Sequence, residues 1–410
     1  MKVLLINNFF SLVGGVEVYI SKLGGMLRKY GIEVGYFATD KQPYLVKGYK
    51  YSKYFPHYKD FNAIKLKEFI KNPSYFYNVE AKEKLDEFLE IYKPDIAHIN
   101  SISRHLSPSV IKSLKEKGIP VIMTLHDGFF ACPDTGLIKG NGDFCYKYPC
   151  AKGNVFHCIL NKCNEGSLIK SIVSSSEFFY RKIHRLYDKI DLFIAPSRAI
   201  KDLALYSGVN KQKIVLLNNF IDEDLFTYEP DYLSKNYFLY AGRLVKEKGI
   251  EFLLQAMLML PPEIELHIAG SGEQEEELKN LALLYGLNNV KFLGMLSQSE
   301  LKKEYRDCIA SVLPANYFEA FGLSVIESFA YGKPVIGTDI GAIPELIDNG
   351  KTGYLVKSAN PEELAGAMLK LINNNIAVKM GRIARLEALS KYSAGDHADK
   401  LIKIYKQFSQ

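Results

Sequence analysis

Short apolar segments alternate with longer segments of helical periodicity along most of the chain. The apolar segments are bounded by turn residues, which is typical of buried parallel strands joined by crossover helices, so we predict an α/β fold. The strands predicted in the first half are KVLLINN (2–8), EVGYFAT (33–39), DIAHINS (95–101), PVIMTLHD (120–127) and DLFIAPS (191–197). Those predicted in the second half are YFLYAGRL (237–244), IELHIAGSG (264–272), NVKFLGML (289–296), CIASVLPA (308–315), PVIGTD (334–339) and TGYLV (352–356).

Each half of the chain is predicted to form its own doubly wound, Rossmann-like sheet. Polar residues, a proline and broken periodicity in the segment 213–236 indicate a connection between two domains. We place an N-terminal domain at 1–217 and a C-terminal domain at 218–392. Apolar residues at helical spacing predict a final helix at 393–410, which could cap either domain. We expect this helix to pack back on the N-terminal domain.

Composition narrows the class of protein. With 410 residues, 48% of them hydrophobic, the chain can bury more than one core. Its net charge of +6 is much smaller than expected of a chain with the dense basic surface of a nucleic-acid binder, so we expect no nucleic-acid partner. There is no apolar run of 18 residues and the first residues lack the features of a signal peptide. We therefore expect a cytoplasmic protein, with peripheral contact to the inner face of a membrane left open.

Residues that suit phosphate binding follow several predicted strands. Ligands of open α/β sheets bind outside the carboxyl ends of the strands. After the first strand, Gly14 and Gly15 open a helix whose free N–H groups suit an anion, although an ordinary turn explains them as well. In AGRLVKEKG, Arg243 and Lys248 could clamp a diphosphate, the alternative being solvated surface charge. Gly270, in AGSG, repeats the strand, turn and helix pattern as a weaker signal.

The stretch YFEAFGLSVIESFAYG sets two carboxylates eight residues apart, on either side of a helix start. The N–H groups at Gly322 and Leu323 suit a phosphate. A carboxylate at Glu327 could accept hydrogen bonds from two ribose hydroxyls, and Glu319 could accept from a second polyol beyond the phosphates. The pair would then bracket a nucleotide-sugar. The alternative is an exposed helix glutamate and an unrelated loop glutamate.

These motifs resemble those of retaining family-4 glycosyltransferases of the GT-B fold. In the second half the resemblance rests on GRLVKEKG, AGSG, FLGML, EAFGLSVIE and GKPVIGTDIGAIPELI, and in the first on GGVEVYI, TLHD, IAPSRAIKD and LLNNFID. It spans most of the chain in the order of the family. It implies two facing Rossmann-like domains with a cleft between them, the N-terminal one binding the acceptor and the C-terminal one the nucleotide-sugar.

The resemblance also implies roles for individual residues. Arg243 and Lys248 would hold the donor's diphosphate, Glu327 its ribose and Glu319 its sugar hydroxyls. His126, in TLHD, would reach the sugar near the anomeric carbon, although a single histidine at a strand end is more often structural. The catalytic set is therefore His126, Arg243, Lys248 and Glu319. The remaining donor-binding positions would be Gly14, Gly15, Asn219, Gly242, Gly270, Met295, Ala320, Phe321, Gly322 and Leu323.

One position departs from the family pattern, because Phe220 follows Asn219 where the family usually has a glycine. This puts the backbone geometry at the connection in doubt. The motifs otherwise imply sugar transfer from a UDP-, GDP- or similar donor, with retention, to a glycan or lipid-linked acceptor in polysaccharide or glycolipid biosynthesis. No Asp-x-Asp pair ends a predicted strand, so we expect no catalytic metal or obligatory cofactor. The alternatives are a sugar-nucleotide epimerase and a non-catalytic binding subunit.

Two segments of the first half bear on the acceptor. The segment GYKYSKYFPHYKDF (48–61) mixes Lys with Tyr and Phe, which suits a lipid-phosphate acceptor at a membrane or a stacked sugar, or else a partly buried helical region. The second segment, 132–163, is rich in cysteine, and its spacing allows a structural zinc or packed thiols, with disulfides less favoured in the cytoplasm. Its cysteines are Cys132, Cys145, Cys150, Cys158 and Cys163.

Overall fold

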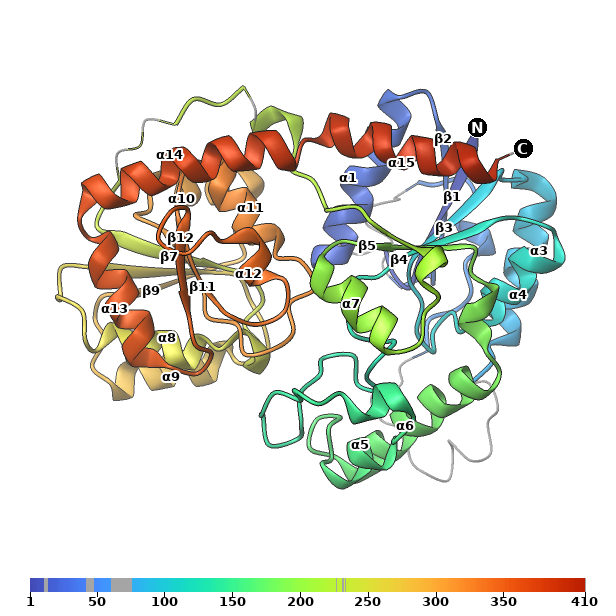
Figure 1. Ribbon diagram of the computed structural model, residues 1–410, viewed down its shortest axis with the longest axis horizontal. Coiled ribbons are helices and arrows are strands. Elements are labelled where there is room, and N and C mark those ends of the chain that lie inside the picture. Colours follow the sequence, from blue (N-terminus) through green and yellow to red (C-terminus); the bar gives the residue numbers. More distant parts are fainter. Residues whose placement is uncertain are drawn as a thin grey trace. The chain divides into compact units, whose positions relative to one another are not determined.

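The computed structural model describes residues 1–10, 14–41, 48–59, 76–225, 227–230, 232 and 234–409. The chain forms two compact units (Figure 1). Unit 1 comprises Met1–Asn218 together with Ala398–Gln410, and unit 2 comprises Asn219–His397. Each unit is described by itself.

Unit 1 is built on a parallel sheet of six strands. Its first strand, β1, pairs with β2 on one side and β3 on the other. The strand order reverses between β1 and β3, because successive strands after β3 extend the sheet away from β1. The strands are nearly continuous apolar runs, as expected where helices cover both faces. Their order is β2 (Glu33–Phe37), β1 (Lys2–Asn7), β3 (Ile96–Ser101), β4 (Val121–Thr124), β5 (Leu192–Ala195) and β6 (Ile214–Leu216).

The helices of unit 1 follow from caps and from apolar stripes. The side chain of Asn78 caps α3 by accepting a hydrogen bond from the N–H of Ala81, and Ser197 caps α7 in the same way from Ile200. Each helix buries one face. They are α1 (Gly15–Lys29), α3 (Val79–Tyr92), α4 (Ser109–Glu116), α5 (Phe156–Leu160), α6 (Leu168–Ile183) and α7 (Arg198–Tyr206).

The last helix, α15 (Ala394–Phe408), begins in unit 2, and from Ala398 onward it belongs to unit 1. Its Tyr405 is fully buried, and the hydroxyl lies 2.6 Å from Nδ1 of His98 on β3. The other ring nitrogen of His98 lies 2.7 Å from the hydroxyl of Thr124 on β4. A polar chain thus ties the end of the protein to the centre of the first sheet.

Unit 2 is also built on a parallel sheet of six strands. Its order reverses between β7 and β10, which pair with each other. Apolar clusters lie on both faces of the sheet and are closed by the helices. The strand order is β12 (Gly353–Val356), β11 (Val335–Thr338), β10 (Ser311–Leu313), β7 (Tyr237–Ala241), β8 (Glu265–Ala269) and β9 (Val290–Gly294). The helices are α8 (Ile250–Met257), α9 (Glu275–Leu284), α10 (Gln298–Asp307), α11 (Leu323–Ala330), α12 (Ile343–Leu346), α13 (Pro361–Leu371) and α14 (Asn374–Lys391).

The segment that the sequence assigned to a connection begins with a strand. Residues Ile214–Leu216 form β6, which pairs with β5 at the edge of the first sheet. Only Ile214 of this strand is buried, so it lacks the continuous burial by which most of the other strands are recognised. Among the described residues, no helix is both long enough and apolar enough to cross a membrane.

Candidate active site

The strongest cluster of candidate residues lies at the strand reversal of unit 2. The loop after β7 carries Arg243 and Lys248, and the loop after β10 carries Glu319. Because β7 and β10 are parallel neighbours, their carboxyl ends open on the same edge of the sheet. A reversal of strand order leaves a crevice between the loops of two adjacent strands, which is where open α/β sheets bind ligands.

Lys248, Glu319 and Tyr317 form one hydrogen-bonded cluster. The ammonium nitrogen of Lys248 lies 3.0 Å from Oε2 of Glu319 and 2.6 Å from the hydroxyl of Tyr317. That hydroxyl also donates to Oε2 of Glu319. Only 14% of the Lys248 side chain and 16% of the Glu319 side chain are exposed, so this ion pair is shielded from water.

The cluster keeps Glu319 ionised. Burial acts to raise the pKa of Glu319, but the charge of Lys248 and the hydrogen bond from Tyr317 outweigh it, and the pKa lies below its usual value. Burial, with the adjacent charge of Glu319, raises the pKa of Tyr317 well above its usual value. Both donors contact the same carboxylate oxygen, Oε2, so Oε1 keeps its capacity to accept hydrogen bonds from a ligand.

Arg243 differs from Lys248 in being exposed. Its side chain is 53% exposed, and its guanidinium lies 3.9 Å from Glu247. Its backbone carbonyl accepts a 2.7 Å hydrogen bond from the hydroxyl of Tyr240, which fixes the start of the loop. The backbone of the loop is therefore fixed at Arg243, while the exposed Arg243 side chain can turn toward an anion.

Two glycines bring the loops of this edge into close contact. A Cβ atom on Gly270 would lie 1.9 Å from the carbonyl oxygen of Gly242, so the loops after β7 and β8 can approach only without a side chain there. A Cβ atom on Gly341 would lie 2.4 Å from the carbonyl oxygen of Glu319 and 2.7 Å from its nitrogen. Gly341 also has a φ of +64°. The backbone of Glu319 is thus packed directly against the loop after β11.

Replacing Gly341 by alanine is expected to disturb the cluster through this backbone. We expect Gly341→Ala to lower the free energy of unfolding by about 1–3 kcal/mol and to weaken any activity that depends on Glu319. Chemical denaturation measures the first effect. Gly350→Ala is the matched control, because Gly350 has a φ of +82° with no atom within 4 Å of the added Cβ. Equal stability losses in the two variants would contradict the packing argument.

The remaining predicted positions of unit 2 surround α11. Gly322 has a φ of +102° and precedes the first helical residue, Leu323. Glu327, one turn later, is half-buried, and its charge contributes to the raised pKa of Tyr331, for which burial is the larger cause. Ala320 and Phe321 are buried, and Asn219 is buried with its side-chain oxygen unpaired. The side chain of Met295, at the end of β9, is 72% exposed.

The structure shows how Phe220 fits at the connection, where the family usually has a glycine. Its side chain is buried, and its ring packs 4.6 Å from that of His397. Its φ is not positive, so the connection does not use the left-handed geometry that favours glycine. The substitution therefore fits the backbone found there.

In unit 1, His126 lies after β4 and is half-buried. Its Nε2 lies 3.1 Å from Oδ1 of Asn100 at the end of β3, and its ring packs edge-on against Tyr19 at 5.1 Å. Burial lowers the pKa of His126, so the ring is neutral near pH 7. The amide nitrogen of Asn100 and the amide oxygen of Asn7 are buried and have no hydrogen-bond partner among the described residues. Such atoms are costly unless a ligand or water satisfies them.

Helix α1 begins at Gly15, after an extended Gly14. The structure thus places the predicted donor residues in two sets. Arg243, Lys248 and Glu319 follow the adjacent strands β7 and β10 of unit 2, whereas Gly14, Gly15 and His126 belong to unit 1. Sequence reasoning missed Tyr317 and Asn100. Each follows the pattern that revealed the others, a polar side chain at or just after the end of a strand.

The cysteines of segment 132–163 are packed inside unit 1. All five cysteines are buried and unbridged, with Cys150, Cys158 and Cys163 forming a small core. A hydrogen bond with Cys163 lowers the pKa of the Cys158 thiol. The Sγ atom of Cys145 lies 3.7 Å from Nε2 of His157. Among the described residues, no three His, Cys, Asp or Glu side chains lie as close together as in a metal site, and the structural zinc stays a prediction from the sequence.

The aromatic segment after β2 packs inward over its described residues, 48–59. Tyr54 and Phe55 are buried, and the ring of Tyr51 lies 5.2 Å from that of Phe88 on α3. Lys50 and Lys53 are exposed, and their ammonium groups lie over the rings of Tyr51 and Tyr54. These residues therefore match the partly buried alternative rather than an exposed aromatic surface, and positions 60 and 61 lie outside the described residues.

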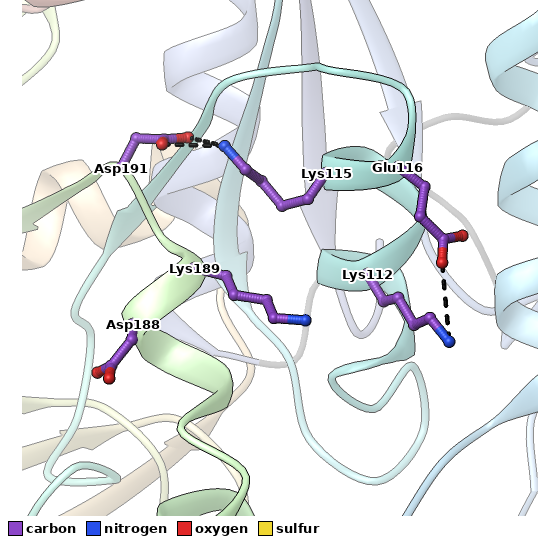
Figure 2. A pocket seen from close by; sticks show the side chains of 6 residues that line it. All are labelled: Lys112, Lys115, Glu116, Asp188, Lys189 and Asp191. Carbon is purple, nitrogen blue, oxygen red and sulfur yellow. Dashed lines mark hydrogen bonds and ion pairs between the residues drawn. The ribbon is translucent and has the colours of Figure 1, made fainter.

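Unit 1 has a surface pocket of 410 Å³, but it does not lie at the carboxyl ends of the strands, where open α/β sheets bind ligands. Figure 2 shows Lys115 of α4 turned toward Asp191, with the Lys115 nitrogen 2.8 Å and 2.9 Å from the two carboxylate oxygens. Asp191 precedes β5, so the pocket opens at the amino ends of the strands. Lys112 pairs with Glu116 and Lys115 with Asp191, and we assign the pocket no ligand. The lining residues are Lys112, Lys115, Glu116, Asp188, Lys189 and Asp191.

Two family sequence models match the chain. The model described as "Glycosyltransferase Family 4" matches residues 13–225, and the one described as "Glycosyl transferases group 1" matches residues 223–387. An uncharacterized glycosyltransferase of Methanocaldococcus jannaschii is 26% identical over 416 residues, covering all of this chain and 99% of that protein. A D-inositol 3-phosphate glycosyltransferase of Corynebacterium jeikeium is 34% identical over 180 residues, 41% of this chain and 42% of that protein.

Solved structures resemble the whole chain. Sucrose-phosphate synthase from Thermosynechococcus elongatus matches with a TM-score of 0.72 at 20% identity, covering 99% of this chain and 98% of that one. The Anabaena protein HepE, in complex with UDP and glucose, matches with a TM-score of 0.71 at 17% identity, covering 99% and 100%. At such identities the likeness establishes the fold, which is the GT-B fold of two doubly wound domains.

Proposed function

The chain belongs to the family-4 glycosyltransferases, and we propose that it transfers a hexosyl group, with retention, from a nucleotide-sugar to a hydroxyl of a glycan or lipid-linked acceptor. The observation that carries this proposal is the shielded cluster of Lys248, Glu319 and Tyr317 at the strand reversal of unit 2. It combines a cation for a phosphate with a carboxylate that stays ionised and has an oxygen to offer to a sugar.

In this proposal the leaving diphosphate is stabilised by fixed positive groups. Negative charge builds on the diphosphate as the bond to the anomeric carbon breaks. Lys248, Arg243 and the N–H groups at the start of α11 would stabilise this charge without a metal ion, and Lys248 and the N–H groups are in position before the donor arrives. The exposed Arg243 would close on the donor from solvent. Asn219, Gly242, Gly270, Ala320 and Phe321 would line the donor.

The two glutamates and His126 would divide the recognition of the sugar and the ribose. Oε1 of Glu319 would accept from sugar hydroxyls, Glu327 would accept from the ribose, and the backbone at Met295 would meet the base. His126 would act in its neutral form. Because Nε2 donates to Asn100, Nδ1 is the acceptor that the ring can offer to a sugar hydroxyl. Asn100 would hold the ring in this tautomer.

The donor is expected to be a UDP- or GDP-sugar or a similar molecule. The complex of HepE with UDP and glucose supports the uridine nucleotide, since the two folds are alike. A polysaccharide or glycolipid pathway and a cytoplasmic location fit such a reaction. No residue of the site favours a sugar-nucleotide epimerase or a non-catalytic subunit over a transferase, and the experiment below distinguishes the three.

A screen of nucleotide-sugars tests the function. We expect nucleotide-sugars with one particular base to raise the melting temperature of the protein, because a ligand that binds only the folded state stabilises it. We also expect the release of nucleoside diphosphate to increase when an acceptor is added. An epimerase would alter the sugar without an acceptor, and a binding subunit would show the thermal shift without turnover. Either result, or no shift with any nucleotide-sugar, would contradict the proposal.

A further inference from the structure

Exposed apolar side chains gather on one part of unit 1 that the proposed active site does not use. Of the 20 large hydrophobic side chains that are exposed among the described residues, seven lie between positions 146 and 183. This segment contains α5 and α6, which pack against each other and lie together in Figure 1. The seven are Tyr146, Phe156, Leu160, Leu168, Ile169, Phe179 and Ile183.

The two helices present these side chains as stripes. On α6, Leu168, Phe179 and Ile183 share one face with the partly exposed Ile172, at spacings of 4, 7 and 4 residues. The opposite face of α6 buries Val173 and Phe178 in unit 1. On α5, Phe156 and Leu160 are four residues apart and are 69% and 80% exposed. Both helices therefore carry an apolar face beyond the one that folding uses.

Contacts beneath the exposed stripes attach α5 to α6 and to unit 1. The thiols of Cys150, Cys158 and Cys163 form the core under α5, and Ser175 of α6 donates a hydrogen bond to the carbonyl of Val155, just before α5. The fold satisfies its core with these small residues and leaves Phe156 and Leu160 in solvent. Such a patch on a folded domain marks an interaction surface.

The charge of the segment identifies the kind of partner. Between positions 146 and 185 there are seven Lys or Arg residues and two Glu or Asp residues, and of the basic ones Arg181 is buried while Lys170 and Arg185 pair with Glu165 and Asp188. Lys147, Lys152 and Lys162 are exposed between or beside the apolar positions. Apolar side chains combined with an excess of lysine suit the headgroup region of an anionic bilayer, where rings and aliphatic chains enter the lipid and ammonium groups meet phosphates.

We propose that α5 and α6 dock unit 1 on the surface of an anionic lipid bilayer, with Phe156, Leu160, Phe179 and Ile183 entering the interface. The docking deepens the proposed function, since it would bring the acceptor-binding unit to a lipid-linked acceptor. It moves the membrane contact away from the aromatic segment 48–59, whose rings pack inward.

Sedimentation with vesicles tests the docking without donor or acceptor. The wild-type protein is expected to bind vesicles made of equal parts phosphatidylglycerol and phosphatidylcholine, and to bind pure phosphatidylcholine vesicles at least about tenfold more weakly. The double variant Phe156→Ser/Leu160→Ser is expected to lose about tenfold or more in partitioning, because both side chains leave the interface. Lys147→Glu/Lys162→Glu should lose a similar factor, and high salt should reproduce that loss.

Leu283→Ser/Leu284→Ser is the matched control, because these side chains are 78% and 80% exposed but lie on α9 of unit 2. It is expected to bind vesicles as the wild type does. The proposal is overturned if the wild type fails to bind anionic vesicles, or if the α5 variant and the α9 control behave alike. Capture of a protein partner by this patch with no vesicle binding would also overturn it. All variants should keep donor binding, so failure here is distinct from failure of the proposed function.

Discussion

Lys248→Met is expected to lower the rate of sugar transfer about 10²–10³-fold while the fold survives. The ammonium of Lys248 is shielded and held by Glu319 and Tyr317, so its charge acts in surroundings where water screens it little. Removing it leaves the developing charge on the diphosphate without its fixed cation. Turnover of the donor with acceptor, measured at saturating donor, reports the effect.

Lys246→Met is the matched control for this variant. Lys246 lies in the same short 3₁₀ helix, Lys246–Lys248, but is exposed. We expect its replacement to change turnover less than about threefold, because exposed charges are well screened. Near-normal turnover in Lys248→Met, or equal losses in the two variants, would show that Lys248 does not act on the leaving group.

The two glutamates are expected to separate by ligand, which is the second large effect. Glu327→Gln should weaken binding of the nucleoside diphosphate about tenfold or more, because an amide is a poorer acceptor for a ribose diol than a carboxylate. Glu319→Gln should leave that affinity nearly intact and lower transfer about 10²-fold, because the contact it loses belongs to the sugar. Calorimetric titration paired with a transfer assay measures both.

The cluster adds a control that the sequence did not suggest. Tyr317→Phe removes the hydroxyl that donates to Glu319 but keeps the carboxylate and Lys248. We expect a smaller loss of transfer than in Glu319→Gln, with unchanged affinity for the diphosphate. If Glu327→Gln and Glu319→Gln both bind the diphosphate as the wild type does, or both lose it equally, the proposed division between ribose and sugar is wrong.

Most of the strand positions could be predicted from the sequence, because buried parallel strands give continuous apolar runs between turn residues. The edge strand β6 could not, because only its first residue, Ile214, is buried and it opens a segment whose polar residues indicate a connection, whereas the equally short β10 is buried throughout. The convergence of Lys248 and Glu319 was also beyond the sequence pattern alone. They are 71 residues apart, and only the order β10-β7 in the sheet makes their loops neighbours.

The polar residues that complete the site illustrate a second limit. Tyr317 and Asn100 have no distinctive spacing in the sequence. Only their hydrogen bonds, from Tyr317 to Glu319 and between Asn100 and His126, show that they belong to the site. The cysteines show the reverse case. Their spacing is compatible with a zinc site or with packed thiols, and only the structure shows that Cys158 hydrogen-bonds to Cys163 while Sγ of Cys145 lies 3.7 Å from Nε2 of His157. Sequence spacing constrains which side chains can meet, and packing decides which of them do.

The central claim, a nucleotide-sugar site in unit 2 built on Lys248, Glu319 and Glu327, is tested most directly by calorimetric titration with UDP, GDP and ADP. We expect one of these nucleotides to bind at a single site with a dissociation constant below about 1 mM, and binding to weaken about tenfold or more in both Lys248→Met and Glu327→Gln. Absence of binding by all three nucleotides, or equal affinity in the wild type and both variants, would contradict the account.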